Sequence, residues 1–423
     1  PVEIKQAVQI QPGRQRSKMP KNFLPQSGTA MKKMKKMIGF GLALAAVSLT
    51  ACGGKKEAET IRIGVVCPRT GESSLFGDVL AETVELLAKQ KNESGGILGK
   101  QIEIKVYDNR DDAVETTNAA RKAVLNDKVC AFIGTDSSAT TIALGEVAAE
   151  NEIPFITSIA TNSKVTMTED GQVRPWAFRA CLSDPQSGAI LGQYAVNECN
   201  YKKIAIIYDL GSDFSVGVTN EFSKNVEGAG GEITVKEAFN TGDVDYRAVL
   251  TKIKNSGDFD ALYIAGGYYK QIGLIANQAR ELGITQPFLT TEGAMSSDLF
   301  NIATDSVEGM IYNVAVDTES KNVEGLLKDF QEMWGYDPSQ NVGPDCYLAY
   351  DAFMLLTGAI EKAGSAEPAK IREALENTTG LQGLTCKITF DPKTHMVYRE
   401  VPICQIENGG FKTIGRFTPS MQK

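Results

Sequence analysis

The stretch "AFIGTDSSATT", residues 131–141, places an apolar run directly before a cluster of hydroxyl side chains. Ala131 to Ile133 is typical of the end of a buried strand, Gly134 interrupts it, and five of the next seven residues carry a hydroxyl. Hydroxyls at the end of a strand can cap a helix, act as nucleophiles or contact a ligand. The rest of the sequence decides among these roles.

The same order of a strand followed by a helix is repeated from residue 60 onward. Apolar runs typical of strands alternate with stretches that repeat apolar residues at helical spacing. The strand-like runs begin with "IRIGVV" (61–66), "IEIKVYD" (102–108), "VCAFIG" (129–134) and "PFIT" (154–157), and the pattern restarts at "KKIAIIYD" (202–209). Such alternation predicts an α/β fold with mostly parallel sheets flanked by helices.

The length of the chain divides this pattern into two lobes, because 423 residues are many for one hydrophobic core. We expect residues 61–183 plus 316–390 to form the N-terminal lobe. Residues 184–315 plus 391–423 are expected to form the C-terminal lobe.

The last hundred residues change from alternation to a run of helices and a hairpin. Helices are predicted near residues 320–334, 344–363 and 367–377. A hairpin is predicted over residues 385–406, and Cys386 and Cys404 could face one another across it as a disulfide.

The N-terminal part of the sequence is predicted to contain an export signal. In "MKKMKKMIGFGLALAAVSLTAC", residues 31–52, a lysine-rich segment precedes an apolar run of about a dozen residues. This run is shorter than the roughly 20 residues that span a bilayer, so residues 31–51 are predicted to be a secretory signal peptide. Residues 1–30 are predicted to be a non-native or misassigned extension and are excluded from the fold.

The end of this signal resembles a bacterial lipobox, Leu49-Thr50-Ala51-Cys52. We expect Cys52 to be lipidated and residues 52–60 to tether the domain to the membrane. The alternative is an ordinary signal peptide with a cysteine at this place by chance.

Several kinds of chemistry are excluded. A net charge of −8 gives no electrostatic footprint for nucleic acid. The only histidine, His395, lies beside a predicted turn, and neither a nucleophile elbow nor a glycine-rich phosphate loop occurs. Asp108, Asp111 and Asp112 are interpreted as helix caps rather than a cation site, since the other calcium-loop ligands are missing. We therefore expect that the protein is not an enzyme and that it binds neither a metal ion nor a cofactor.

Binding geometry is what the sequence does offer. Ligands of open parallel sheets lie outside the carboxyl ends of the strands, near helix N-termini. Polar residues follow strands in "GTDSSATT" (134–141), "TSIATNS" (157–163), "GSDFSVG" (211–217) and "TTEGAM" (290–295). The first two suit a carboxylate, and Glu292 in the last suits an ammonium. Together they predict a site for an amino-acid zwitterion.

The sequence resembles the periplasmic amino-acid-binding proteins of the branched-chain type, the type I solute-binding components of ABC importers. The similar segments appear in the family's order over residues 60–316, and more loosely to about residue 410. They are "TGESSLFGDV", "NESGGILGKQIEIKVYDNRDDA", "VCAFIGTDSSATT", "PFITSIATNS", "AFRACLSDPQSG", "KKIAIIYDLGSDFSVGV", "DALYIAGGYYKQIGLIANQARELG", "TEGAMSS" and "EGMIYNVAV". The resemblance implies the type I periplasmic-binding-protein fold, with a hinge between the lobes.

The resemblance also implies roles for single residues. Ser138 and Thr161 match positions that receive the ligand carboxylate, while the Ala160 carbonyl and Glu292 match positions that receive its ammonium. Other positions implied to line the site are Phe76, Asp136, Ser137, Asp184, Phe214 and Tyr268, with Phe214 where the family often has Tyr. From the residues alone, Ser138 can equally be a helix cap, Phe76 a core residue and Asp184 a turn residue.

Two acids depart from the family pattern. Asp136 and Asp345 stand where branched-chain binders tend to place apolar or aromatic contacts. Burying a carboxylate against an apolar ligand side chain is costly without a partner. The resemblance therefore implies membership of this family, whereas the two acids favour a more polar amino acid or a related molecule as the ligand. The family's N-lobe disulfide is not expected, since residues 109–113 contain no cysteine.

The expected protein is a monomeric, extracytoplasmic lipoprotein, anchored through Cys52, that captures an amino-acid-like solute by lobe closure. It is expected to deliver the solute to an ABC permease and ATPase complex. A ligand-sensing receptor on the same fold, or a binder of amides or other small polar solutes, is the alternative. A hydrolase would need a nucleophile and a base that the sequence does not show.

Overall fold

The computed structural model describes residues 60–303, 305–342, 345–395 and 397–417. The predicted extension (1–30), signal peptide (31–51) and lipidated Cys52 lie outside these residues. Within the described part of the chain, no helix is both long and apolar enough to cross a membrane.

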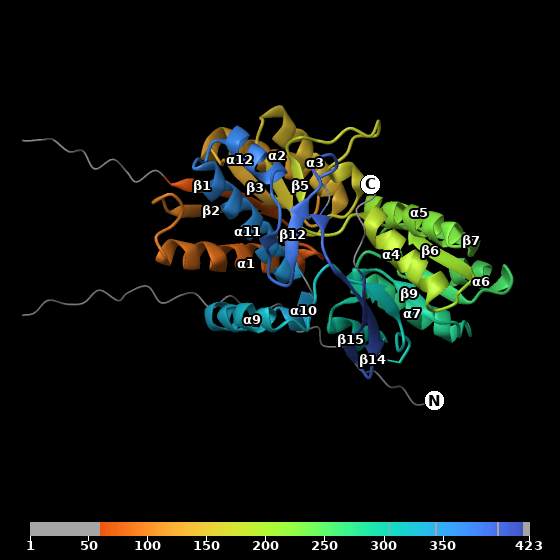
Figure 1. Cartoon of the computed structure of the whole chain (residues 1–423). Coiled ribbons are helices and arrows are strands. Elements are labelled where there is room, and N and C mark those ends of the chain that lie inside the picture. The colour runs from red at the N-terminus through yellow and green to blue at the C-terminus, as the bar shows by residue number, and fades with distance from the viewer. Residues whose placement is uncertain (1–59, 304, 343–344, 396, 418–423) are drawn as a thin grey trace, which may run out of the picture. The chain divides into compact units, whose positions relative to one another are not determined.

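The N-terminal lobe is built on a five-stranded parallel sheet in the order β2-β1-β3-β4-β5 (Figure 1). Its strands are β1 (Ile61–Cys67), β2 (Ile102–Asp108), β3 (Ala131–Gly134), β4 (Phe155–Thr157) and β5 (Ala177–Arg179). Its central strands are near-continuous apolar runs because both faces of the sheet are covered by helices. Phe132 of β3 packs with Leu144 and Ala148 on one face, while Ile133 packs into the larger core on the other.

The helices of this lobe come from distant parts of the sequence. α2 (Ala113–Lys122), a π-helical turn (Ala123–Asp127) and α3 (Ser138–Glu150) pack together. α1 (Ser74–Glu93) contacts α9 (Lys321–Trp334), α10 (Ser339–Val342) and α11 (Asp345–Ala363), and α11 contacts α12 (Pro368–Glu376) as well as β3 and β4. The late helices thus return to the first sheet, as Figure 1 also shows.

The C-terminal lobe is built on a seven-stranded sheet in the order β15-β14-β10-β9-β8-β6-β7. Its strands are β6 (Lys203–Asp209), β7 (Glu232–Phe239), β8 (Ala261–Ala265), β9 (Phe288–Thr290), β10 (Ile311–Asn313), β14 (Val401–Glu407) and β15 (Gly410–Phe417). All pairs are parallel except β10 with β14 and β14 with β15. The observed α/β architecture with two lobes confirms the predicted fold class.

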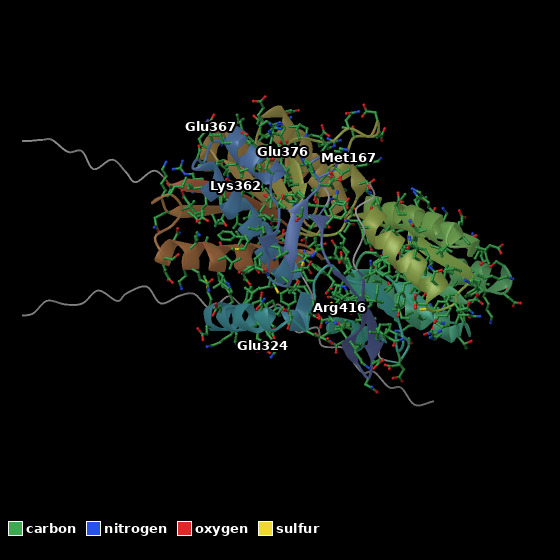
Figure 2. All side chains as sticks on the ribbon, viewed as in Figure 1. Met167, Glu324, Lys362, Glu367, Glu376 and Arg416 are labelled. Atoms are coloured by element: carbon green, nitrogen blue, oxygen red, sulfur yellow. The ribbon has the colours of Figure 1, made fainter. Side chains whose placement is uncertain are left out.

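The helices of the C-terminal lobe form two packed pairs. α4 (Asp184–Asn197) packs with α5 (Asp213–Gly228), and α6 (Arg247–Asn255) contacts α7 (Tyr269–Glu281). α8 (Asp298–Ala303) packs on α7, and single 3-10 turns follow β4 (Ser163–Val165) and β9 (Glu292–Ala294). Charged surface side chains such as Glu324, Lys362 and Arg416 are exposed (Figure 2).

The predicted hairpin over residues 385–406 is found only up to residue 398, because the strand at residues 401–407 joins another sheet. β12 (Lys387–Phe390) pairs with β11 (Leu381–Gln382) and β13 (Val397–Tyr398) in a small antiparallel sheet, whereas β14 pairs with β10 and β15. Cys386 and Cys404 therefore belong to different sheets, and both are free thiols. The predicted disulfide between them is wrong, because β14, which carries Cys404, leaves this small sheet and joins the seven-stranded one.

A buried ion pair fastens the segment that leads into β14. Arg399 donates from Nη2 to Asp351 Oδ2 over 2.9 Å, and neither side chain is exposed to solvent. Arg399 Nη1 also donates to the Ala180 carbonyl over 2.9 Å, and Asp351 Oδ1 accepts from the Leu384 amide over 2.7 Å. α11, the end of β5 and the late segment are thus joined at one point between the two sheets.

Candidate ligand-binding site

Most hydroxyl side chains after β3 cap α3 or hydrogen-bond to one another, and the Ser138 hydroxyl is the exception. Ser137, not Ser138, is the N-cap of α3, and its Oγ accepts from the Thr140 amide. Thr135 Oγ1 lies 2.6 Å from Thr140 Oγ1 and 2.7 Å from Thr141 Oγ1, so these hydroxyls satisfy one another. Ser138 is buried, and its Oγ accepts from the Asn162 amide over 3.3 Å. The helix-cap alternative for Ser138 is therefore not the one that the structure shows.

A fully buried arginine positions the loop after β4. Arg179 at the end of β5 donates to the carbonyls of Ala160 over 3.2 Å and Asn162 over 2.8 Å, and also to the carbonyl of Thr161. The Ala160 carbonyl predicted to face an ammonium thus already accepts from Arg179 and, over 3.5 Å, from the Cys181 thiol. The Thr161 hydroxyl is buried and has no hydrogen-bond partner among the described residues.

Asp184 begins α4 beside this loop. Its amide donates to the Thr161 carbonyl over 2.8 Å. Both of its carboxyl oxygens are buried without a hydrogen-bond partner among the described residues. Burial raises the pKa of Asp184 to about 7, although the nearby Thr161 hydroxyl and the Arg179 guanidinium lower it. This is an unsatisfied carboxyl at the position where the zwitterion was predicted.

The C-terminal lobe approaches the loop closely here. Asn162 Nδ2 donates to the Asp213 carbonyl at the start of α5 over 2.6 Å. A Cβ on Gly217 would lie 2.2 Å from Asp184 Oδ2 and 2.8 Å from Asn162 Nδ2, so only glycine fits at this contact. Phe214, on the same turn of α5, is partly buried against the core.

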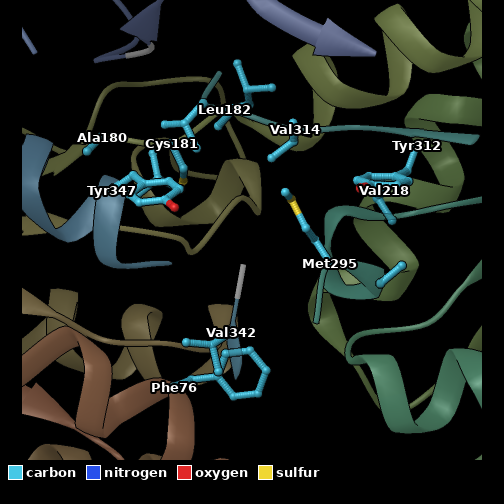
Figure 3. Packing of buried hydrophobic residues seen from close by; sticks show 14 of the residues in the cluster. Phe76, Ala180, Cys181, Leu182, Val218, Met295, Tyr312, Val314, Val342 and Tyr347 are labelled. Atoms are coloured by element: carbon cyan, nitrogen blue, oxygen red, sulfur yellow. The ribbon is translucent and has the colours of Figure 1, made fainter. Parts of the chain in front are cut away.

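An aromatic pair connects α1 with the start of α7. The rings of Phe76 and Tyr268 lie 4.7 Å apart between centroids. Phe76 is buried, and Figure 3 shows it beside Val342, whereas the Met295 side chain points toward Val314. Phe76, Tyr268 and Val342 are thus apolar neighbours of one another.

Glu292 lies directly after β9 and is partly buried. Burial raises the pKa of Glu292 to about 7, while the Ala315 amide and the Arg399 guanidinium lower it. Its carboxyl therefore ionises more readily when a cation is supplied, which suits an ammonium acceptor.

Asp136 and Asp345 are also buried, at the end of β3 and the start of α11. Burial raises the pKa of Asp136 well above its usual range, and the charges of Asp345 and Asp111 add to this. Burial and the Glu292 charge likewise raise the pKa of Asp345. The acids that depart from the family pattern thus lie within one electrostatic neighbourhood.

Three contributors were missed in the sequence: Arg179, Asn162 and Ser73, whose Oγ donates to Asp111 Oδ2 over 3.0 Å. A lone arginine in the apolar run "AFRAC" was a usable signal for Arg179, whereas nothing local distinguishes the other two. Among the described residues, no group of three His, Cys, Asp or Glu side chains could hold a metal ion.

The comparisons place the chain in a class. It belongs to the periplasmic binding protein family, whose model matches residues 60–411. It is a type I member of the branched-chain amino acid family and thus a solute-binding protein rather than an enzyme, which confirms both the resemblance and the predicted absence of catalysis.

Individual relatives cover most of the chain. The Leucine-, isoleucine-, valine-, threonine-, and alanine-binding protein of Pseudomonas aeruginosa is 31% identical over 338 residues, 79% of this chain and 87% of that protein. The leucine binding protein LivK of Thermotoga maritima has a TM-score of 0.76 and 31% identity, covering 85% of this chain and 99% of its own. LivJ of Streptococcus pneumoniae, solved with isoleucine, has a TM-score of 0.75 and 28% identity over 85% and 100% of the two chains.

The stability of the unliganded protein should depend on pH through Asp184. Its pKa rises from the usual 3.8 to about 7 on folding, so the folded state holds a proton that the unfolded state has lost. The resulting stabilisation is present below pH 4 and is lost as the pH rises through 7. We expect the melting temperature of Asp184→Asn, relative to that of the wild type, to increase over this range. A constant difference between the two melting curves from pH 4 to pH 8 would contradict this prediction.

Proposed function

We propose that this chain is an extracytoplasmic lipoprotein that captures an amino-acid-like solute and delivers it to an ABC permease and ATPase complex. The single observation that carries the proposal is the placement of polar groups of opposite preference on the two lobes, hydroxyls after strands of the first sheet and an acid after a strand of the second. Ser138 and the unpartnered Thr161 hydroxyl follow strands of the first sheet, and Glu292 follows a strand of the second. A zwitterionic ligand has a carboxylate for the first lobe and an ammonium for the second.

Capture follows from this division of the site. A ligand that contacts both lobes only when they are closed stabilises the closed state by the contacts that the open state lacks. The Ser138 and Thr161 hydroxyls would donate to the carboxylate, while Glu292 would accept from the ammonium. The relatives named above support an amino acid as the ligand class, and Asp136 and Asp345 support one more polar than leucine.

The ammonium assignment is tested by Glu292→Gln. A thermal-shift screen of the mature domain against amino acids, amides and small acids identifies the best ligand, because a ligand that binds only the folded state raises its stability. We expect Glu292→Gln to weaken that ligand by about 10–100-fold in calorimetric titration, since a charge-assisted hydrogen bond is lost. The matched control is Glu324→Gln, an exposed acid on α9. Equal affinities for wild type and Glu292→Gln would show that the ammonium binds elsewhere.

Membrane attachment and delivery need separate tests. Mass spectrometry of the mature protein should find a lipid on Cys52, and Cys52→Ser should release the domain from membranes. Uptake of the labelled ligand by the reconstituted permease should require the binding protein.

We also propose that the domain acts as a monomer with the lobe boundaries given above. Size-exclusion chromatography tests the oligomeric state, and limited proteolysis tests the boundaries.

A further inference from the structure

We propose that the solute carries a second cationic group, bound by a subsite that Asp111, Asp136 and Asp345 form beside Tyr268. This inference rests on the proposed function, since it concerns the side chain of the ligand, which the groups that bind the α-carboxylate and α-ammonium do not contact. The ligand class is then an α-amino acid with a basic side chain.

The geometry of Asp136 provides the first support. Its side chain is only 4% exposed, and its Oδ2 is buried without a hydrogen-bond partner among the described residues. It stands on the connection from β3 to α3, two residues before Ser138, the first residue of α3. A carboxylate in this position costs much free energy when it is ionised and alone, and a cation in hydrogen-bonding contact removes that cost.

Asp111 provides the second support, from a different element. Its Oδ2 accepts from Ser73 Oγ over 3.0 Å, which leaves Oδ1 buried and unpartnered. It was interpreted as a helix cap, but Asp112 alone caps α2, accepting from the amides of Val114 and Glu115. Asp111 is therefore free of a capping role, and one of its oxygens is available.

The surroundings are acidic and aromatic without a compensating base. In the described part of the chain, no ion pair involves Asp111, Asp136 or Asp345. The carboxyl charges of Asp136, Asp111 and Asp345 all act on the Tyr268 hydroxyl and, together with burial, raise its pKa. Tyr268 also packs with Phe76, and aromatic rings attract organic cations.

A metal ion does not explain the same groups. The described residues contain no three acidic, thiol or imidazole side chains close enough to share one ion. Carboxylates that lie near one another without converging on a point suit an ammonium or guanidinium, whose several N–H donors reach different acceptors. A branched aliphatic side chain would instead bury apolar surface against these acids.

The test is calorimetric titration of the intact mature protein with ornithine, lysine and arginine, and with the neutral analogues norleucine and glutamine. At least one basic amino acid should bind about 10–100-fold more tightly than norleucine. Asp136→Asn and Asp345→Asn should each remove most of this preference. Asp305→Asn, at an exposed acid, is the matched control.

The outcomes separate the two proposals. Tighter binding of norleucine than of every basic amino acid, or an unchanged preference in both Asn variants, would overturn the cationic subsite and leave the amino-acid site in place. If cadaverine bound and no α-amino acid did, the cationic subsite would be retained, and the proposed receptor for the α-carboxylate and α-ammonium would be overturned. Melting curves of the variants report folding, and if one Asn variant does not fold, the wild-type ligand series and the other variant still decide.

Discussion

Arg399→Met is expected to lower the free energy of unfolding by about 3–5 kcal/mol, because it leaves the carboxylate of Asp351 buried without its counter-ion. Both side chains are completely buried, and their closest atoms are 2.9 Å apart. The substitution also leaves the Ala180 carbonyl without the donor that Arg399 supplies over 2.9 Å. Chemical denaturation of the mature domain, followed by fluorescence, measures the change.

The double variant Asp351→Leu with Arg399→Met should be more stable than Arg399→Met alone. Replacing both members of a buried pair with apolar groups removes the unpaired charge, whereas replacing one member creates it. Arg247→Met is the control, since the Arg247 side chain is 49% exposed in its pairs with Asp245 and Glu281 and should cost less than about 1 kcal/mol. A loss for Arg399→Met no larger than the loss for this control would disprove the structural role of the buried pair.

Local patterns predicted the elements well. The helices predicted near residues 320–334, 344–363 and 367–377 are found at Lys321–Trp334, Asp345–Ala363 and Pro368–Glu376, within one residue of the predicted ends. These helices have apolar spacing of one clear period. Parallel strands with both faces covered are likewise visible as short apolar runs between such helices.

Pairing partners could not be predicted in the same way. The strands after residue 385 have the right composition for a hairpin, but composition does not say which neighbour a strand pairs with. β14 pairs with β10, about ninety residues earlier in the chain, in preference to β12. That choice depends on the exposed edge of the seven-stranded sheet, which is a property of the assembled lobe.

In the candidate site, too, some features could be predicted from local sequence and others could not. The positions of Ser138, Thr161 and Glu292 after strands could be predicted from the alternation of strands and helices, whereas their roles in binding, implied by the resemblance, stay predictions. The availability of an acid at Asp111 could not be predicted, because it depends on Ser73, 38 residues away. Arg179 was missed for a related reason, since its acceptors lie 13 to 19 residues earlier and become neighbours only when β5 joins β4.

Arg179→Met is expected to weaken ligand binding by more than about 100-fold and to destabilise the fold by about 3–5 kcal/mol. The guanidinium holds the carbonyls of Ala160, Thr161 and Asn162 and the Thr166 hydroxyl from inside the protein. Without it, four buried acceptors lose a donor and the Thr161 hydroxyl loses its fixed position. Calorimetric titration and denaturation on the same samples separate the two effects.

Arg179→Lys distinguishes geometry from charge at this position. Lysine keeps the positive charge but cannot reach several acceptors as a planar fork. If the charge chiefly stabilises a ligand carboxylate near Thr161, Arg179→Lys should retain most of the affinity, whereas if the fork chiefly holds the loop, it should resemble Arg179→Met. We expect the second result, because the guanidinium nitrogens are already directed at backbone carbonyls that lie between the charge and the site. Wild-type affinity in Arg179→Met would show that the loop keeps its conformation without the arginine and would remove Arg179 from the site.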